Sequence, residues 1–358
     1  MLTTPLQDGF WMPGEHAPQQ AVWLAWPTRV DNWRQQAKPA QRAFLHFIHQ
    51  LQKVVQVNLA VLPELVESVR ECVPKDVEVH AIAYNDAWMR DIGPTIVVNQ
   101  TGEKRAVNWQ FNAWGGERDG LYEDWQADQS VASKVAKREQ VQQYDAPFIL
   151  EGGAIHCDGE GTLYTTEECL LHPSRNPHLS KAQVEANLRE YLGVEKVIWL
   201  PKGLYNDETN GHIDNILHVV RPGEVMLTVC EDPSDPQYDI SMMALDILKD
   251  EKDAQGRNIK VYALPMPGPL YISETEATGL VSSDRMAREA GERLAASYAN
   301  FLICNDSIFY PLLDEQEDKA AARVFAQAFP NHKLIGIPAR DILLGGGNLH
   351  CISQQIPR

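Results

Sequence analysis

Short apolar runs recur along this chain of 358 residues, and each one follows a polar or glycine-flanked position. The polar positions are Asp91, Glu151, Asp214, Asn300 and Asn348, and the runs that follow them are residues 93–98, 154–156, 216–220, 301–304 and 349–352. The steps between these positions are 60, 63, 86 and 48 residues, a loose period with an insertion in one unit. The runs are brief and apolar, most are rich in β-branched residues, and we therefore expect each to be a β-strand.

Helical periodicity falls between these runs, at residues 40–55, 180–192, 283–298 and 314–328. Ser180 has the side chain of an N-cap, and Pro201, Pro265 and Pro338 mark points where strands enter loops. Approximate repeats of this kind indicate a closed ring of α/β units, in which each unit sends one polar side chain toward the axis. A doubly wound sheet with unrelated strand ends is the alternative that the pattern leaves open.

The composition is that of a globular protein with a formal net charge of −17. This charge disfavours nucleic acid and anionic membrane surfaces as partners, because both require basic patches. It is compatible with a small cationic substrate and also with solubility alone. The candidate site residues extend from residue 91 to residue 351 with no low-complexity linker between them, so we expect one catalytic domain over residues 1–358.

The cysteines lie at positions 72, 157, 169, 230, 304 and 351, and no two of them form a C-x-x-C pair. No spacing of Cys and His resembles a zinc site, and the chain is too long and too poor in Cys for a disulfide scaffold. The N-terminus lacks the basic start and apolar run of a signal peptide, and no apolar run approaches the length of a membrane span. We therefore expect a cytoplasmic protein.

Cys351 is the strongest candidate for chemistry because three glycines, at 345–347, precede it. Glycines permit sharp turns and close approach of a ligand to the backbone. We interpret residues 348–352 as a short strand beside a site, and strand alternation would put His212 and Asp214 on one face of another strand. A thiol, an imidazole and carboxylates are the parts of a covalent hydrolase. The alternative is a buried apolar cysteine beside a core histidine.

The carboxylates of Asp91, Glu151 and Asp214 narrow the choice of substrate, provided that they converge on Cys351. Negative charge around a thiol raises its pKa, which makes poor sense for a peptidase with a neutral substrate. A guanidinium brings its own positive charge and presents N–H donors that match carboxylates bidentately. His212 could donate a proton to departing ammonia and then activate water.

Other polar residues have a structural and a functional interpretation. Trp88 could stack on a cationic substrate or pack in the core. His350 and Arg90 are interpreted as structural residues, since each is next to a site residue and should face away from the site. Residues near the substrate tail could include Glu15, His16, Asp207 and Glu208, although solvated loop charge explains each one singly. The remaining cysteines are expected in the core or at strand ends.

Five motifs in order resemble the agmatine deiminases. They are Met12-Pro-Gly-Glu-His, Trp88-Met-Arg-Asp91-Ile-Gly-Pro, Leu150-Glu-Gly-Gly, Asn206-Asp-Glu-Thr-Asn-Gly-His-Ile-Asp214-Asn and Gly345-Gly-Gly-Asn-Leu-His-Cys351. The resemblance extends nearly from end to end, and several motifs in order are far more specific than any one. This family belongs to the guanidino-group-modifying superfamily, together with arginine deiminases and peptidylarginine deiminases.

The resemblance implies a fold, a reaction and a role for each site residue. The fold would be a five-bladed, pseudo-symmetric α/β propeller of the pentein type. Cys351 would be the nucleophile, His212 the acid and base, and Glu151 the partner of His212, while Asp91 and Asp214 would bind the guanidinium. The reaction would convert agmatine and water to N-carbamoylputrescine and ammonia, a step of polyamine and putrescine biosynthesis, without a metal or an organic cofactor. The sequence does not determine the oligomeric state, and a homo-oligomer is one alternative.

Other functions remain as alternatives to agmatine deimination. One is a related enzyme that acts on free or peptidyl arginine or that transfers a guanidine-derived group. Another is a catalytically silent propeller that binds a ligand or protein, which the presence of both Cys351 and His212 disfavours. A papain-like peptidase is disfavoured because its nucleophile lies near the mature N-terminus.

Overall fold

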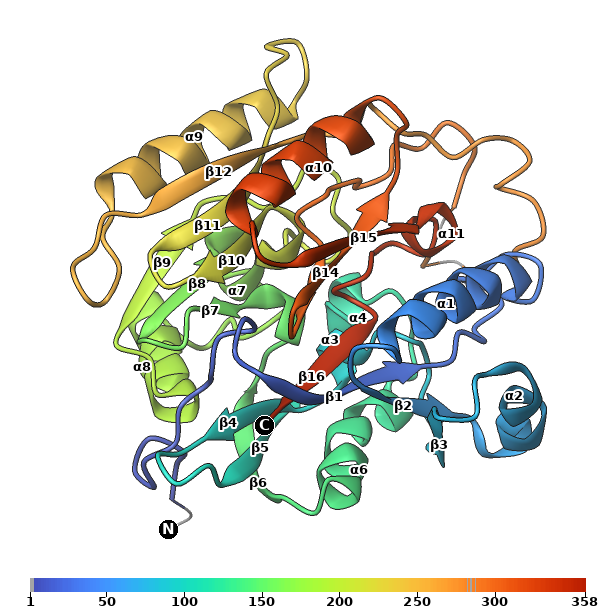
Figure 1. Cartoon of the computed structure of the whole chain (residues 1–358), viewed down its shortest axis with the longest axis horizontal. Coiled ribbons are helices and arrows are strands. Elements are labelled where there is room, and N and C mark those ends of the chain that lie inside the picture. The colour runs from blue at the N-terminus through green and yellow to red at the C-terminus, as the bar shows by residue number, and fades with distance from the viewer. Residues whose placement is uncertain (1–2, 282, 284, 287) are drawn as a thin grey trace.

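The computed structural model describes residues 3–281, 283, 285–286 and 288–358, and its strands form five small sheets arranged as a ring (Figure 1). Each sheet repeats one plan: an inner strand pairs antiparallel with the next strand, which pairs parallel with a third after a helical connection. This confirms the predicted ring of α/β units and excludes the single doubly wound sheet.

The first sheet joins the two ends of the chain. Its elements are β16 (Ser353–Pro357), β1 (Gln19–Ala25), β2 (Gln56–Val61) and β3 (Glu78–Ala81), with α1 (Lys38–Leu51), η1 (Pro63–Leu65) and α2 (Val66–Cys72) between them. β16 is antiparallel to β1, with Ile356 opposite Ala21 and Ser353 opposite Leu24, and Figure 1 shows the two strands side by side. The last strand therefore closes the ring two residues after Cys351.

The other four sheets follow in chain order. The second has β4 (Thr95–Val98), β5 (Lys104–Gln110) and β6 (Gln142–Ile149), with α3 (Met89–Ile92), α4 (Gly116–Asp119), α5 (Gln126–Gln129) and α6 (Val131–Arg138). The third has β7 (His156–Cys157), β8 (Thr162–Thr166) and β9 (Lys196–Leu200), with η2 (Gly152–Ala154), α7 (Glu167–Leu170) and α8 (Lys181–Leu192). The fourth has β10 (Leu217–Arg221), β11 (Glu224–Val229) and β12 (Lys260–Pro265), with η3 (Ile213–Asn215) and α9 (Gln237–Asp250). The fifth has β13 (Leu302–Cys304), β14 (Ser307–Leu312) and β15 (Lys333–Pro338), with α10 (Glu317–Ala328), followed by α11 (Arg340–Leu343).

Local sequence explains why the long helices form where they do. Ser180 caps α8 as predicted, in a reciprocal capping box with Gln183, and Gly193 ends the helix in a left-handed conformation. In α1, Phe44, Phe47, Ile48 and Leu51 recur at helical spacing and are buried against the strands. Such helices cover the outer side of each sheet, and Figure 1 shows α1, α2, α8 and α9 at the periphery. The sequence also placed α10 correctly, and Pro201, Pro265 and Pro338 lie at strand ends.

The predicted helix at residues 283–298 and the predicted strand at residues 348–352 were wrong. The described residues of 283–298 form turns and extended chain rather than a helix, and residues 284 and 287 lie outside the description. Arg288 in this stretch donates to Glu208 at 2.7 Å and to the carbonyl of Gly345 at 2.8 Å, so its charge is satisfied by the ring rather than by solvent. Residues 348–352 form turns, and the strand begins at Ser353.

The inner strands position the site, because four of them follow repeated polar residues and the fifth, β16, follows Asn348 and Cys351. Asp91 lies in α3 before β4, Glu151 precedes η2 and β7, and Asp214 lies in η3 before β10. Asn300 and Cys351 precede β13 and β16 in the same way. None of the helices within the described ranges combines the length and apolar character needed to cross a membrane.

The closing strand should be essential for stability because Ile356 is 1% exposed in the largest apolar cluster. We expect Ile356→Ala to lower the free energy of unfolding by about 2–5 kcal/mol through lost burial and a residual cavity. Chemical denaturation measures the change. Leu6→Ala, at a side chain 45% exposed, is the control and should change stability by less than about 0.5 kcal/mol. Equal effects of the two substitutions would contradict the closure of the ring by β16.

Candidate active site

Cys351 lies in the turn between α11 and β16, where the three preceding glycines leave room for the site. A Cβ on Gly347 would lie 2.5 Å from the Trp88 ring and 3.1 Å from Cys351 Sγ, so this position excludes any side chain. Gly346 has a φ of 108°, which favours glycine. The side chain of Cys351 is buried, and Asn300 Nδ2 lies 2.9 Å from its sulfur. Asn300 Oδ1 accepts from the backbone N–H groups of His350 and Cys351, so this side chain fixes the turn.

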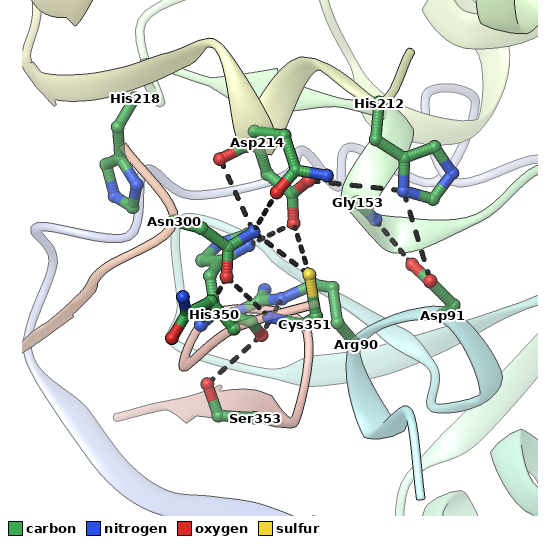
Figure 2. Close-up of polar contacts among 12 residues, drawn as sticks. Arg90, Asp91, Gly153, His212, Asp214, His218, Asn300, His350, Cys351 and Ser353 are labelled. Carbon is green, nitrogen blue, oxygen red and sulfur yellow. Dashed lines mark hydrogen bonds and ion pairs between the residues drawn. The ribbon is translucent and has the colours of Figure 1, made fainter. Parts of the chain in front are cut away.

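Asp214 also lies beside the sulfur, with Oδ2 3.6 Å from Cys351 Sγ (Figure 2). It belongs to η3, and His212 is the residue before that turn, so the strand alternation proposed for these two residues was wrong. The turn nevertheless brings both side chains into the site. His212 Nδ1 is 4.0 Å from Asp214 Oδ1, and both side chains are fully buried.

Asp91 and Glu151 face the same imidazole. His212 Nδ1 lies 3.9 Å from Asp91 Oδ2, and His212 Nε2 lies 3.8 Å from Glu151 Oε2. Asp91 Oδ1 accepts from the Gly153 N–H, and Asp91 Oδ2 accepts from Trp114 Nε1, both at 2.8 Å. Figure 2 shows Asp91, Gly153 and His212 together. The structure thus brings the five predicted catalytic residues into one cluster.

Several buried atoms in this cluster have no hydrogen-bond partner among the residues that the structure describes. They are both ring nitrogens of His212, Asp214 Oδ1 and Glu151 Oε2. Buried polar atoms are ordinarily paired, and exceptions often have a catalytic role or an absent ligand. The two carboxylate oxygens therefore mark the place where a substrate with several N–H donors would be held.

Mutual repulsion and burial shift the pKa values of these groups. Burial, reinforced by Asp214 and Asp91, raises the pKa of Cys351 well above its ordinary value. Burial also raises the pKa of Asp91 to about 6. Burial lowers the pKa of His212, but the charge of Asp91 and contacts to Cys169 and Glu151 outweigh burial and hold it well above the ordinary value. At neutral pH the resting site therefore has a neutral thiol and a protonated imidazole.

Glu151 owes its charge to a residue that the sequence did not indicate. Arg175 Nε donates to Glu151 Oε1 at 2.7 Å, and both side chains are fully buried. Burial raises the pKa of Glu151, but the charge of Arg175 outweighs it and holds that pKa below its usual range. Glu151 therefore remains a carboxylate beside His212, which stabilises the imidazolium.

Trp88 lies beside the site as part of an aromatic pair. Its ring stacks on Trp33, with centroids 5.2 Å apart, and Asp86 accepts a hydrogen bond from each indole N–H. Its edge lies near Gly347 and hence near Cys351. This placement is compatible with both earlier interpretations, and stacking on a substrate stays a prediction.

Two residues predicted at the substrate tail have other contacts. Glu15 is buried, and its carboxylate contacts His350 Nε2 at 2.9 Å and the Ile303 N–H at 2.7 Å. Asp207 Oδ2 accepts from the backbone N–H of His212 and from Asn215 Nδ2, both at 3.0 Å. Glu15 thus lies behind His350, and Asp207 holds the loop that carries His212, while a role of either residue at the substrate tail stays a prediction.

Glu208 lines a surface cavity of about 160 Å³ together with Asp207, Glu292, Arg288 and Gly346. Arg288 pairs with both oxygens of Glu208. His16 is only partly exposed, and burial lowers its pKa. Among the residues that the structure describes, neither Glu208 nor His16 makes a hydrogen bond to any of the five catalytic candidates.

Sequence reasoning missed Asn300, Trp114, Arg175 and His350. Asn300 could have been found, because it is the fourth polar residue of the repeat. His350 was interpreted as facing away, but in a turn rather than a strand its Nδ1 contacts Asp214 Oδ2 at 2.7 Å. Arg90 is structural as predicted, and its guanidinium contacts the carbonyl of His350, Gln355 and Glu15.

Two clusters of three side chains contain residue types that can bind a metal ion. One comprises His156, His218 and His350, and the other comprises Glu151, Cys169 and His212. In each, one potential ligand atom per residue lies within 4.8 Å of the others. His350 Nε2 is already hydrogen-bonded to the Glu15 carboxylate, and one oxygen of Glu151 already accepts a hydrogen bond from Arg175. The chemistry of the thiol site can be derived from the protein groups alone.

Comparison with known proteins agrees with this geometry. Residues 11–357 match the family described as Porphyromonas-type peptidyl-arginine deiminase. A Vibrio parahaemolyticus protein whose name places it among the agmatine deiminases is 56% identical over 99% of each chain. The solved agmatine deiminase of Enterococcus faecalis superposes with a TM-score of 0.97 at 42% identity, covering 100% of this chain and 98% of that one.

A more distant structure is a cysteine-to-serine variant of the C. jejuni agmatine deiminase with substrate bound. It has a TM-score of 0.84 and 29% identity, covering 98% of this chain and 96% of that one. The family match spans almost the whole sequence, and the relatives match over nearly their full length. The chain therefore belongs to the Porphyromonas-type peptidyl-arginine deiminase family and, within it, to the agmatine deiminases.

Proposed function

We propose that this protein, as a single catalytic domain, hydrolyses agmatine to N-carbamoylputrescine and ammonia through a covalent intermediate on Cys351. The observation that carries the proposal is the convergence of Cys351 with His212 and the carboxylates of Asp91, Glu151 and Asp214. The family membership and the names of the relatives support the same substrate. The six free cysteines, including a buried thiol nucleophile, favour a reducing compartment such as the cytoplasm.

Substrate binding would depend on the attraction between the positive guanidinium and the buried carboxylates. A guanidinium placed between Asp91 and Asp214 would donate N–H groups to both carboxylates and would satisfy Asp214 Oδ1. Its positive charge, next to the sulfur, opposes the negative charges that raise the pKa of Cys351. The thiol would thus lose its proton to solvent only when the substrate is in place.

The chemistry then takes place in two steps. The thiolate forms a bond to the central guanidinium carbon, and the imidazolium of His212 gives its proton to the leaving nitrogen, which departs as ammonia. The product of this step is an amidino-thioether on Cys351. Water next loses a proton to His212 and adds to the same carbon. The C–S bond breaks, N-carbamoylputrescine leaves, and the sulfur regains a proton from solvent.

Substrate selectivity tests the proposed function. We expect kcat/KM for agmatine to exceed that for free arginine by about 100-fold or more, because the α-carboxylate of arginine would enter an acidic site, and to exceed that for an arginyl peptide, whose backbone lacks the ammonium charge of the agmatine tail. Arg288 is near this site, but Glu208 already pairs with it. Ammonia release from the three compounds measures the ratio. A preference for either arginine substrate would contradict the proposal.

The nucleophile can be tested separately. Cys351→Ser should lower kcat by about 10⁴-fold or more without changing the melting temperature appreciably. Acid quenching of the wild-type enzyme during turnover should trap a mass increase of agmatine minus ammonia, located on the C-terminal peptide. Cys72→Ser, at an exposed cysteine, is the matched control and should retain full activity. A trapped adduct on another cysteine would exclude Cys351 as the nucleophile.

The acidic surroundings predict an unusual thiol titration. In the free enzyme, the alkylation rate of Cys351 should keep rising at pH values above the ordinary thiol pKa of about 8.5, because the carboxylates disfavour the thiolate. Asp214→Asn removes one negative charge and should move the midpoint to lower pH. Alkylation of Cys351→Ser gives the background from other cysteines. A wild-type midpoint well below 8.5 would contradict the proposed electrostatics.

A further inference from the structure

A line of hydrogen bonds extends from the back of the site to the sulfur. Glu15 Oε2 lies 2.9 Å from His350 Nε2, His350 Nδ1 lies 2.7 Å from Asp214 Oδ2, and Asp214 Oδ2 lies 3.6 Å from Cys351 Sγ. Glu15, His350 and Asp214 are 6%, 1% and 0% exposed, so water does not compete for these contacts. Figure 2 shows His350 close to both Asp214 and Cys351.

The geometry determines the protonation state of His350. Each ring nitrogen faces a carboxylate oxygen at hydrogen-bond distance, but a neutral imidazole has only one N–H. Only the imidazolium satisfies both contacts as a donor. Burial and the charge of Arg90 lower the pKa of His350, yet the two carboxylates outweigh them and hold that pKa above its ordinary value.

We propose that His350 is a positioning residue whose positive charge, held between Glu15 and Asp214, aims Asp214 at the substrate and keeps it ionised. This inference rests on the proposed function, in which Asp214 binds the guanidinium. It also accounts for Glu15, whose motif the catalytic roles left unexplained. His350 touches neither the substrate position nor the reacting atoms, and it acts through Asp214.

The effect of His350 is visible when Asp214 is compared with Asp91, the other carboxylate proposed to bind the guanidinium. Burial raises the pKa of Asp214, but the hydrogen bond and charge of His350 lead the effects that outweigh it, and the net pKa is lowered. Asp91 has the His212 imidazole 3.9 Å away but accepts no hydrogen bond from it among the described contacts, and burial outweighs that charge and raises the pKa of Asp91 to about 6. His350 also occupies Asp214 Oδ2, which leaves Oδ1 as the unpaired oxygen available to the substrate.

The other charged groups around this line complete the electrostatic balance. Arg90 lies 3.4 Å from Glu15 Oε2, and His218 Nε2 lies 3.3 Å from Glu15 Oε1. Burial lowers the pKa of both His218 and His156, which favours the neutral form of each ring. The groups that face Asp214 and His350 are therefore Glu15, Arg90, His156, His212, His218, Asp91 and Cys351. Loss of the His350 charge would leave the carboxylates in excess.

Two substitutions separate the charge of His350 from its hydrogen bond. His350→Asn retains a neutral N–H donor near the position of Nδ1, whereas His350→Phe removes both the donor and the charge. We expect His350→Asn to lower kcat/KM for agmatine about 10–100-fold at pH 7, mainly through KM. Without the cation the pKa of Asp214 rises, so the acidic limb of the kcat/KM profile should move to higher pH and activity should partly recover above it. His350→Phe should lose activity across the whole range.

His218→Asn is the matched control, because His218 is equally buried and contacts Glu15 but not Asp214. Its acidic limb should stay where the wild-type limb lies, even if its melting temperature falls by the same amount. An unmoved limb in His350→Asn, with an active wild-type enzyme, would overturn this inference while leaving the proposed function intact. An inactive wild-type enzyme with agmatine would instead overturn the proposed function.

Discussion

The site is constrained by the unfavourable free energy of burying several carboxylates close to one sulfur atom, where water cannot hydrate them. Asp91, Glu151 and Asp214 lie within 4.0 Å of the His212 imidazole, and all four side chains are buried. Like charges repel strongly in an environment of low dielectric, and each buried ion loses its hydration. Such a cluster persists only if counter-charges are built around it. A binding site results where one counter-charge is left for the substrate to supply.

The protein supplies its own counter-charges from behind the site. Arg175 pairs with Glu151, His350 pairs with Asp214, and Arg90 contacts Glu15 on the far side of His350. These contacts keep the carboxylates ionised while their free oxygens face His212 and Cys351. In the proposed mechanism the thiol stays protonated in this field until a cation enters. Selectivity and activation would then have one electrostatic origin, because the bound cation would also lower the pKa of the thiol.

The ring explains how one chain assembles this cluster. Each sheet supplies one polar residue just before its inner strand, so Asp91, Glu151, Asp214, Asn300 and Cys351 reach the centre from five separate units. Pairing of β16 with β1 fixes the last of them, since Cys351 is two residues from the closing strand. A rigid frame on all sides holds like charges at distances that a flexible loop would relax.

The sequence predicted the repeat, the ring and the five residues that the structure brings together, because spacing and motif order are visible without coordinates; their catalytic roles stay predictions. It failed where tertiary contacts replaced local preference. Residues 348–352 form turns because Asn300 ties two backbone N–H groups there, and this reversed the expected direction of His350. Residues 283–298 have a helical pattern, but Arg288 is bound by Glu208 and by the backbone of Gly345. Arg175 carries no local signal, since only the fold brings it to Glu151.

The central claim is that the site recognises the positive charge of the substrate rather than its shape. Agmatine and N-carbamoylputrescine test this claim directly, because they share a planar carbon with three substituents and differ there mainly in charge. Calorimetry on the inactive Cys351→Ser variant would give both dissociation constants at pH 7. The account predicts that agmatine binds about 100-fold more tightly or better, since the neutral compound leaves the buried carboxylates without a counter-charge. Equal affinities would contradict it.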